Sequence, residues 1–227
     1  MVEIVPAILE KDATSFEEKL KKVWGEAKKV QVDIIDGKFA PMETIEPEVL
    51  LNIDTIVDFE GHLIVERPED WIERCVAAGM TGLFGQVEMM EDVVKFVADT
   101  QSAGLRVGLA YDIDTPLTDL ENYINDLDAV LLMSAKAGSQ GVNEFDSRVL
   151  DKIKQVRKIN KRVVIVVDGG LDVDSIKKCF AAEWAEELSE DELDRNFGKM
   201  EFAVGSEIFE AVDIKEKLEE LESLGAR

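Results

Sequence analysis

The sequence predicts an α/β protein with the (β/α)8 fold of a TIM barrel. Strand-like apolar runs alternate with segments of helical periodicity along the whole chain. Eight such pairs fit into 227 residues, which matches the barrel in number and in length. Alternation of this kind implies a parallel sheet with right-handed crossovers. An open, doubly wound sheet is the second candidate, and it is less favoured because no glycine-rich dinucleotide loop follows the first strand.

Eight segments have strand character, because each is a short run rich in apolar residues. The predicted strands are Glu3–Leu9, Lys29–Ile35, Thr55–Ile64, Gly82–Val87, Arg106–Tyr111, Ala129–Met133, Arg162–Val167 and Phe202–Val204. The fourth is weakened by its glycines, and the seventh is the richest in β-branched residues.

The segments between these strands carry helix signals. The run Thr14–Glu17 has the composition of a capping box. Pro47, Pro68 and Pro116 fit the first turns of the helices that they open, and Gly104 ends another. The predicted helices are Thr14–Trp24, Pro47–Leu51, Pro68–Gly79, Glu91–Ala103, Pro116–Ile124, Asp146–Ile159, Asp172–Trp184 and Asp213–Leu224.

Residues 1–227 are predicted to form a single domain, because no linker rich in Pro, Gly or Ser divides them. One connection is too long for the usual short return from helix to strand, namely the acidic insertion at about 183–199 between the seventh helix and the last strand. In a barrel this connection lies at the end away from the active face. We therefore interpret it as a decoration or an oligomer contact rather than as part of a site.

The composition and net charge limit the classes of partner that the protein can bind. A formal net charge of −23 makes nucleic acid and anionic membrane surfaces poor partners. No apolar run approaches the ~20 residues of a membrane helix, and the N-terminus lacks the features of a signal peptide. The two cysteines, Cys75 and Cys179, have no metal-ligand spacing, so buried free thiols in a reducing compartment are expected. We expect a soluble, cytoplasmic protein. A homo-oligomer is compatible with the sequence, since outer barrel faces are amphipathic in any assembly.

The second predicted strand contains a carboxylate that needs an explanation. Side chains alternate between the two faces of a strand, so Gln31, Asp33 and Ile35 share one face. Burying a carboxylate is costly unless it is paired, hydrogen-bonded or bound to a metal. Asp33 therefore indicates either a structural ion pair or a catalytic site.

Polar side chains also follow other predicted strands near their C-terminal ends, where barrels place their active groups. The set is rich in carboxylates and contains the only histidine of the chain: Gln31, Asp33, Glu60, His62, Gln86, Glu88 and Asp168. A lone histidine is more often structural than functional. Because His62 shares a strand-end layer with carboxylates, both interpretations stay open.

Glycine turns follow the last three predicted strands, at Gly138–Gly141, Gly169–Gly170 and Gly205–Ser206. A single glycine turn is weak evidence for a site, but the three together are typical of the phosphate site that barrels form beyond strands seven and eight. Backbone N–H groups can hold a phosphate without lysines, which suits a chain this acidic. Lys136 is interpreted as a solvated loop residue.

With these residues in place, the chain resembles the ribulose-phosphate 3-epimerases nearly from end to end. The individual motifs are loose, but their order and spacing are specific. They are Pro6–Leu9, Val32–Gly37, Phe39, Pro41, His62–Leu63, Pro68–Glu69, Thr115–Leu117, Met133–Ser134, Val167–Gly170 and Gly205–Phe209. The resemblance implies a TIM barrel of the ribulose-phosphate-binding type and an isomerase of carbohydrate metabolism, in the pentose phosphate pathway.

The family interconverts ribulose 5-phosphate and xylulose 5-phosphate through proton transfer at C3 by two carboxylates, with an enediolate stabilised by a divalent metal cation. By resemblance, Asp33 and Asp168 are the acid/base pair. The implied metal site consists of Asp33, His62, Asp168 and Gln31. The phosphorylated ketopentose would be bound by Ala7, Met133, Gly138, Ser139, Gly141, Gly169, Gly170, Gly205 and Ser206.

Several positions depart from the family pattern. Gln31 stands in the place of a metal-binding histidine, and its neutral amide oxygen is a weak ligand, better suited to oxygen-preferring ions than to zinc. Ala7 replaces a serine of the substrate pocket, and Gln86 replaces a histidine at the end of the fourth strand. Ile35 and Ile64 stand where methionines normally cover the intermediate.

These departures leave two alternatives to an active 3-epimerase. One is a catalytically weak or inactive sugar-phosphate-binding barrel derived from the family, and the other is a related isomerase acting on another ketose phosphate. Related sugar-phosphate decarboxylases and synthases place a lysine between two aspartates of one strand. Here Ile34 and Ile35 separate Asp33 from Asp36, which disfavours that chemistry.

Overall fold

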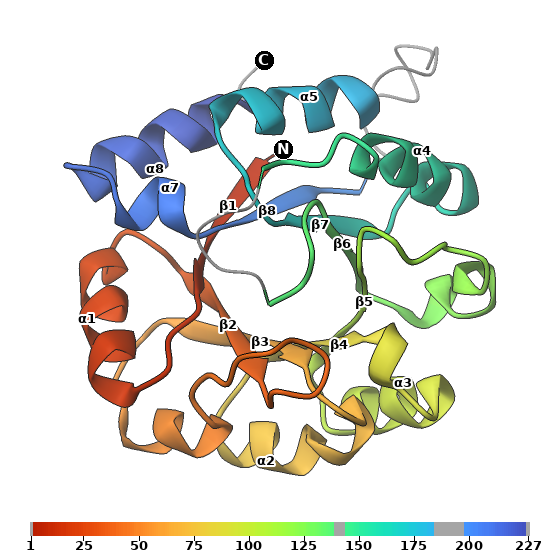
Figure 1. Cartoon of the computed structure of the whole chain (residues 1–227), viewed down its shortest axis with the longest axis horizontal. Helices are drawn as coiled ribbons and strands as arrows, with labels where there is room; N and C mark the ends of the chain where they lie inside the picture. Colours follow the sequence, from red (N-terminus) through yellow and green to blue (C-terminus); the bar gives the residue numbers. More distant parts are fainter. Residues whose placement is uncertain (1, 139–143, 184–197, 226–227) are drawn as a thin grey trace.

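The computed structural model describes residues 2–138, 144–183 and 198–225, and its strands form one closed parallel barrel (Figure 1). Each strand pairs with the next along the chain, and β1 closes the ring on β8. The strands are β1 (Val2–Ile8), β2 (Lys29–Ile35), β3 (Asp58–Ile64), β4 (Gly82–Gln86), β5 (Arg106–Tyr111), β6 (Ala129–Met133), β7 (Val164–Asp168) and β8 (Met200–Val204). The predicted (β/α)8 barrel is confirmed, and the open sheet is wrong.

Helices surround the ring of strands (Figure 1). The α-helices are α1 (Ala13–Val23), α2 (Ile72–Ala77), α3 (Val93–Ser102), α4 (Val149–Ile159), α5 (Val173–Glu183), α7 (Ser206–Phe209) and α8 (Ile214–Ser223). Short 3-10 helices occupy several connections: η1 (Pro47–Asn52), η2 (Pro68–Asp70), η3 (Val87–Met89), η4 (Leu120–Asn122) and η5 (Ile124–Asp126).

The alternation predicted for β2 is confirmed, and it separates two apolar regions. Val30, Val32 and Ile34 belong to the larger core between the barrel and its helices. Ile35 faces the interior of the barrel and belongs to a smaller cluster there, together with Phe84. The polar residues of the inner face therefore lie inside the ring of strands.

Some predicted boundaries are wrong for identifiable reasons. Helix α1 begins before the predicted capping box, because Oδ1 of Asp12 accepts a hydrogen bond of 3.0 Å from the N–H of Ser15 and takes the N-cap role. Strand β3 begins at Asp58 rather than Thr55, because the hydroxyl of Thr55 accepts from the N–H of Val57 in a local turn.

The helix predicted from Pro116 to Ile124 is also wrong. The segment contains the 3-10 turns η4 and η5 instead. Lys152 is buried beneath the preceding loop, and its Nζ donates to the carbonyl oxygens of Asp112 and Thr115 at 2.5 and 2.6 Å. The carbonyl of Thr115, which a continuous α-helix would use, is therefore bound to a lysine from α4.

The N-terminal end of the barrel is closed by a buried charge network. Arg106 on β5 donates to both carboxylate oxygens of Glu60 at 2.7 and 3.0 Å and to those of Glu201 at 2.9 and 3.1 Å. Nζ of Lys29 lies 2.9 Å from Glu201 and 3.3 Å from Glu60. Although burial opposes it, the charges of Arg106 and Lys29 lower the pKa of Glu201. These groups compensate one another where an uncompensated charge would be costly.

Two further expectations can be compared with the structure. Cys75 and Cys179 are both buried and free of disulfides, as predicted. Among the described helices there is none whose length and apolar content would let it cross a bilayer.

Candidate active site

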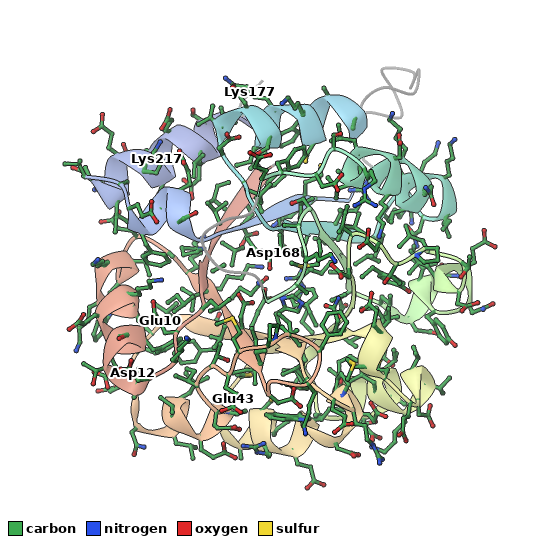
Figure 2. The ribbon with its side chains drawn as sticks, viewed as in Figure 1. Glu10, Asp12, Glu43, Asp168, Lys177 and Lys217 are labelled. Carbon is green, nitrogen blue, oxygen red and sulfur yellow. The ribbon has the colours of Figure 1, made fainter. Side chains whose placement is uncertain are left out.

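Four polar residues converge on the inner face of the barrel. Gln31 and Asp33 lie on β2, His62 on β3, and Asp168 ends β7. Asp33 pairs in register with His62, and all four side chains are buried. In Figure 2, Asp168 lies near the middle of the ring of strands. The structure thus brings together residues that the sequence separates by as many as 137 positions.

Direct contacts join the four side chains. Nδ1 of His62 lies 3.2 Å from Oδ1 of Asp33 and 3.5 Å from Oδ2 of Asp168. Nε2 of Gln31 donates to the same two oxygens, at 2.9 Å to Asp33 and 2.6 Å to Asp168. Both carboxylates are therefore held by an amide from one side and by an imidazole from another.

The electrostatics of the site follow from its burial. Burial raises the pKa of Asp33, and the nearby charge of Asp168 adds to this, while the hydrogen bond from His62 works in the opposite direction. For His62 burial alone would lower the pKa, but hydrogen bonds to Asp168 and Asp33 and their charges raise it to about 10. The two carboxylates therefore favour the protonated form of His62, and burial opposes it.

Asp33, His62 and Asp168 also fit a divalent cation. Each offers one ligand atom, and these atoms lie within 4.8 Å of one another. Two carboxylates and an imidazole are a donor set that many divalent transition metals accept. Gln31 directs its amide nitrogen at the carboxylates. Its predicted role as a ligand requires the amide to turn so that Oε1 faces them instead.

Gln86 joins the site from β4. Its Oε1 lies 3.0 Å from Nε2 of His62, and both side chains are fully buried. The sequence identified Gln86 as a polar residue at the end of a strand and as a departure from a family pattern. Its contact with His62 depends on the pairing of neighbouring strands and has no local signal.

Two hydroxyl groups that the sequence analysis missed support the strands of the site. Oγ1 of Thr44 donates to the carbonyl of Asp33 at 2.7 Å and accepts from the N–H of Ile35 at 2.8 Å. Oγ of Ser134 donates to the carbonyl of Asp168 at 3.0 Å. Both residues are buried, and they fix the backbone beside each catalytic candidate.

The glycine turns meet at the C-terminal end of the barrel. Gly169 has φ +108°, and a Cβ there would lie 2.9 Å from the Cβ of Ala135, so the loops after β6 and β7 need glycine to pack together. Gly138, with φ +71°, lies against Ala40 in the loop after β2. Gly205 lies beside the carbonyl of Ala7. Ser139 and Gly141 lie outside the described residues.

The turn after β8 leads into α7, as the sequence indicated. In the described part of the chain, the N–H groups of Ser206 and Glu207 donate to no other residue. Such groups can receive a phosphate oxygen. Met133, another predicted substrate contact, pairs in register with Asp168 and is buried in the inner cluster.

Other candidates do not join the site. Glu60 shares a face with His62 but lies at the opposite end of the barrel, paired with Arg106. Glu88 lies in η3, where its Oε1 accepts from the N–H of Asp112 at 2.8 Å. Lys136 is exposed, with Nζ 3.9 Å from Asp114. Most of the acidic insertion, residues 184–197, lies outside the described residues.

The chain is similar to known proteins over most of its length. Residues 3–186 match the model of the ribulose-phosphate 3 epimerase family. The chain is 30% identical over 228 residues to the ribulose-phosphate 3-epimerase of Escherichia coli (strain K12), covering 97% of this chain and 94% of that one. It is 30% identical over 180 residues to the enzyme of that name from Bacillus subtilis (strain 168), covering 76% of this chain and 82% of that one.

Solved structures with little sequence identity share the fold. The 3-hexulose-6-phosphate synthase of Salmonella typhimurium aligns with a TM-score of 0.67 at 13% identity, covering 98% of this chain and 97% of that one. The orotidine 5'-monophosphate decarboxylase of Methanocaldococcus jannaschii aligns with a TM-score of 0.65 at 13% identity over 100% of both chains. At such identity they support the barrel architecture alone.

Proposed function

The chain belongs to the ribulose-phosphate 3-epimerase family, and from that premise we propose that it interconverts ribulose 5-phosphate and xylulose 5-phosphate. The observation that carries the proposal is the placement of Asp33 and Asp168. They reach one buried site from different strands, and both contact Nε2 of Gln31. Epimerisation at a carbon next to a carbonyl needs such a pair, because the proton leaves one face and returns to the other.

The proposed chemistry is a balanced pair of proton transfers. One carboxylate takes the proton from C3, and the electrons of the broken C–H bond move to the carbonyl oxygen at C2, which gives an enediolate. The other group, protonated at the start, gives its proton to the opposite face of C3 as the carbonyl re-forms and is left as a carboxylate. The raised pKa of Asp33 supports this use, because an acid/base group works best with a pKa near the working pH.

Asp33, His62 and Asp168 would hold the divalent cation of this family. When bound, the cation supplies positive charge beside the oxygens of the enediolate. Gln31 adds two hydrogen bonds that keep both carboxylates aligned. For the phosphate group we propose the backbone of Gly169, Gly170 and the Gly205–Ser206 turn, which needs no cationic side chain in a chain of net charge −23.

The direct test is to incubate the purified protein with ribulose 5-phosphate, with and without added divalent cations, and to measure xylulose 5-phosphate. We expect turnover with a cation, loss of turnover after chelation and recovery when the cation is restored. If the folded protein shows no turnover with any divalent cation but still binds the pentulose phosphate, it is the non-catalytic binding barrel. Turnover of a different ketose phosphate alone would identify the related isomerase.

Cation binding should also depend on pH in a definite direction. A cation and a proton compete for Nδ1 of His62, whose pKa is about 10 in the free protein. Affinity should therefore rise about tenfold per pH unit while the pH stays below that value. Competition titrations between about pH 6 and 9 would measure the slope, and the His62→Ala variant should show a shallower one. An affinity that does not change with pH in the wild-type protein would contradict the assignment of His62 as a ligand.

A further inference from the structure

Gln86 contacts the imidazole of His62 on the side away from the carboxylates. Its Oε1 lies 3.0 Å from Nε2 of His62, whereas Nδ1 of the same ring lies 3.2 Å from Oδ1 of Asp33. Gln86 and His62 are both 0% exposed, so no solvent competes for these contacts. Each ring nitrogen therefore has a defined partner.

This contact selects one form of the imidazole. A carbonyl oxygen can only accept, so the bond requires a hydrogen on Nε2 of His62. In a neutral imidazole a hydrogen on Nε2 leaves the lone pair on Nδ1. Nδ1 is the nitrogen that faces Asp33 and Asp168, and a lone pair at that position is what a cation held between the carboxylates requires.

The amide nitrogen of Gln86 provides a second observation. It is buried and has no hydrogen-bond partner among the described residues. Turning the amide over would pair the nitrogen with His62 and leave the carbonyl oxygen unpaired, so neither orientation satisfies both ends within the free protein. A buried unpaired polar group is unfavourable. Its position beside His62 therefore indicates a role in the site rather than in the stability of the barrel.

We propose that Gln86 is a positioning residue that holds His62 with Nε2 protonated and thereby sets the affinity of the site for a divalent cation. This inference rests on the cation-binding part of the proposed function and is independent of the substrate. Partners of this kind, which orient a metal-binding histidine, typically contribute about 10- to 100-fold to metal affinity. The same geometry leaves the amide nitrogen available to donate to an oxygen of a bound ligand.

The experiment measures the affinity of the full-length protein for Zn²⁺, by competition with a coloured chelator and without substrate. Gln86→Met removes both polar atoms at similar volume, and Gln86→Glu keeps an acceptor oxygen. Gln101→Met is the matched control, since Gln101 is exposed and donates to the carbonyl of Asp126 far from the site. We expect about 10- to 100-fold weaker binding for Gln86→Met, with Gln86→Glu and Gln101→Met close to the wild type.

A second measurement does not depend on the cation. Because the chain has a single histidine, ¹⁵N-labelled histidine gives the signals of one imidazole. Exchange of the Nε2–H should be slow in the wild type and in Gln86→Glu, and faster in Gln86→Met, because methionine removes the acceptor of this hydrogen. Unchanged Zn²⁺ affinity and an unchanged Nε2–H signal in Gln86→Met would overturn the inference. Equal losses in Gln86→Met and Gln86→Glu would also overturn it, because they would trace the effect to packing.

The outcomes separate this inference from the proposed function. If the wild-type protein has no epimerase activity but its Zn²⁺ affinity depends on Gln86, the result contradicts the proposed reaction and supports the inference. An active wild-type protein whose Zn²⁺ affinity is independent of Gln86 supports the reaction and overturns the inference.

Discussion

Replacing either Asp33 or Asp168 by asparagine should lower kcat for epimerisation by about 100- to 10,000-fold, which is the usual contribution of a positioned acid or base. Asparagine keeps the shape of each side chain but can neither take nor release the proton at C3. Both aspartates contact Gln31 and His62, so the amide also keeps a hydrogen-bonding partner in the buried site. Steady-state conversion of ribulose 5-phosphate to xylulose 5-phosphate measures the loss.

Isotope exchange at C3 can show which carboxylate acts on which face of that carbon. Each variant keeps one carboxylate, which can still exchange the C3 proton of the isomer whose C–H bond faces it. We expect Asp33→Asn to retain exchange from one pentulose phosphate and Asp168→Asn from the other. Asp151→Asn is the control, since Asp151 lies exposed on α4 beside Lys154. Epimerisation at the wild-type rate in either site variant would contradict the two-carboxylate mechanism.

Replacing Arg106 by methionine should lower the free energy of unfolding by about 3–5 kcal/mol, as is usual when one partner of a buried ion pair is removed. The change leaves Glu60 and Glu201 at the closed end of the barrel with Lys29 as their remaining cationic partner. Their carboxylate side chains are only 7% and 5% exposed, so water cannot replace the guanidinium. Denaturant titration measures the loss.

The control for this change is Arg67→Met. Arg67 pairs with Asp70 at 3.0 Å, but its side chain is 48% exposed, so the expected loss is within about 1 kcal/mol. The destabilisation of Arg106→Met should also shrink as the pH falls, because the charge of Arg106 lowers the pKa of Glu201 and protonation of Glu201 removes its unpaired charge. An Arg106→Met variant as stable as Arg67→Met would show that the network contributes no net stability.

Local patterns predicted the strands better than the helices. In β2 the alternation of apolar and polar residues correctly assigned each side chain to a face, because the period of a strand is a property of its backbone. The segment after Pro116 has helical spacing but forms two 3-10 turns, because Lys152 of α4 binds the carbonyl of Thr115. A competitor from a distant part of the chain cannot be recognised from local periodicity.

In the site, too, some features could be identified from the sequence and others depend on the tertiary structure. Asp33 was identified because a carboxylate in a buried strand requires a partner, and Asp168 because it directly follows a strongly β-branched run. Glu60 was correctly assigned to the same face as His62, but it does not join the site. The period of two assigns a side chain to the inside of the barrel, whereas the partners it meets there come from other strands: Arg106 and Lys29 bind Glu60.

By itself, then, the amino-acid sequence determined the number of strands, the faces of the side chains of β2 and the resemblance that led to the proposed acid/base pair. All of these follow from short-range periodicity and from the order of motifs. Only the tertiary structure decided what Asp33 touches: the amide nitrogen of Gln31, the Nδ1 atom of His62 and, through that ring, the carbonyl of Gln86. The contacts with His62 and Gln86 depend on strand register, which arises when distant segments pack together, whereas Gln31 reaches Asp33 along its own strand.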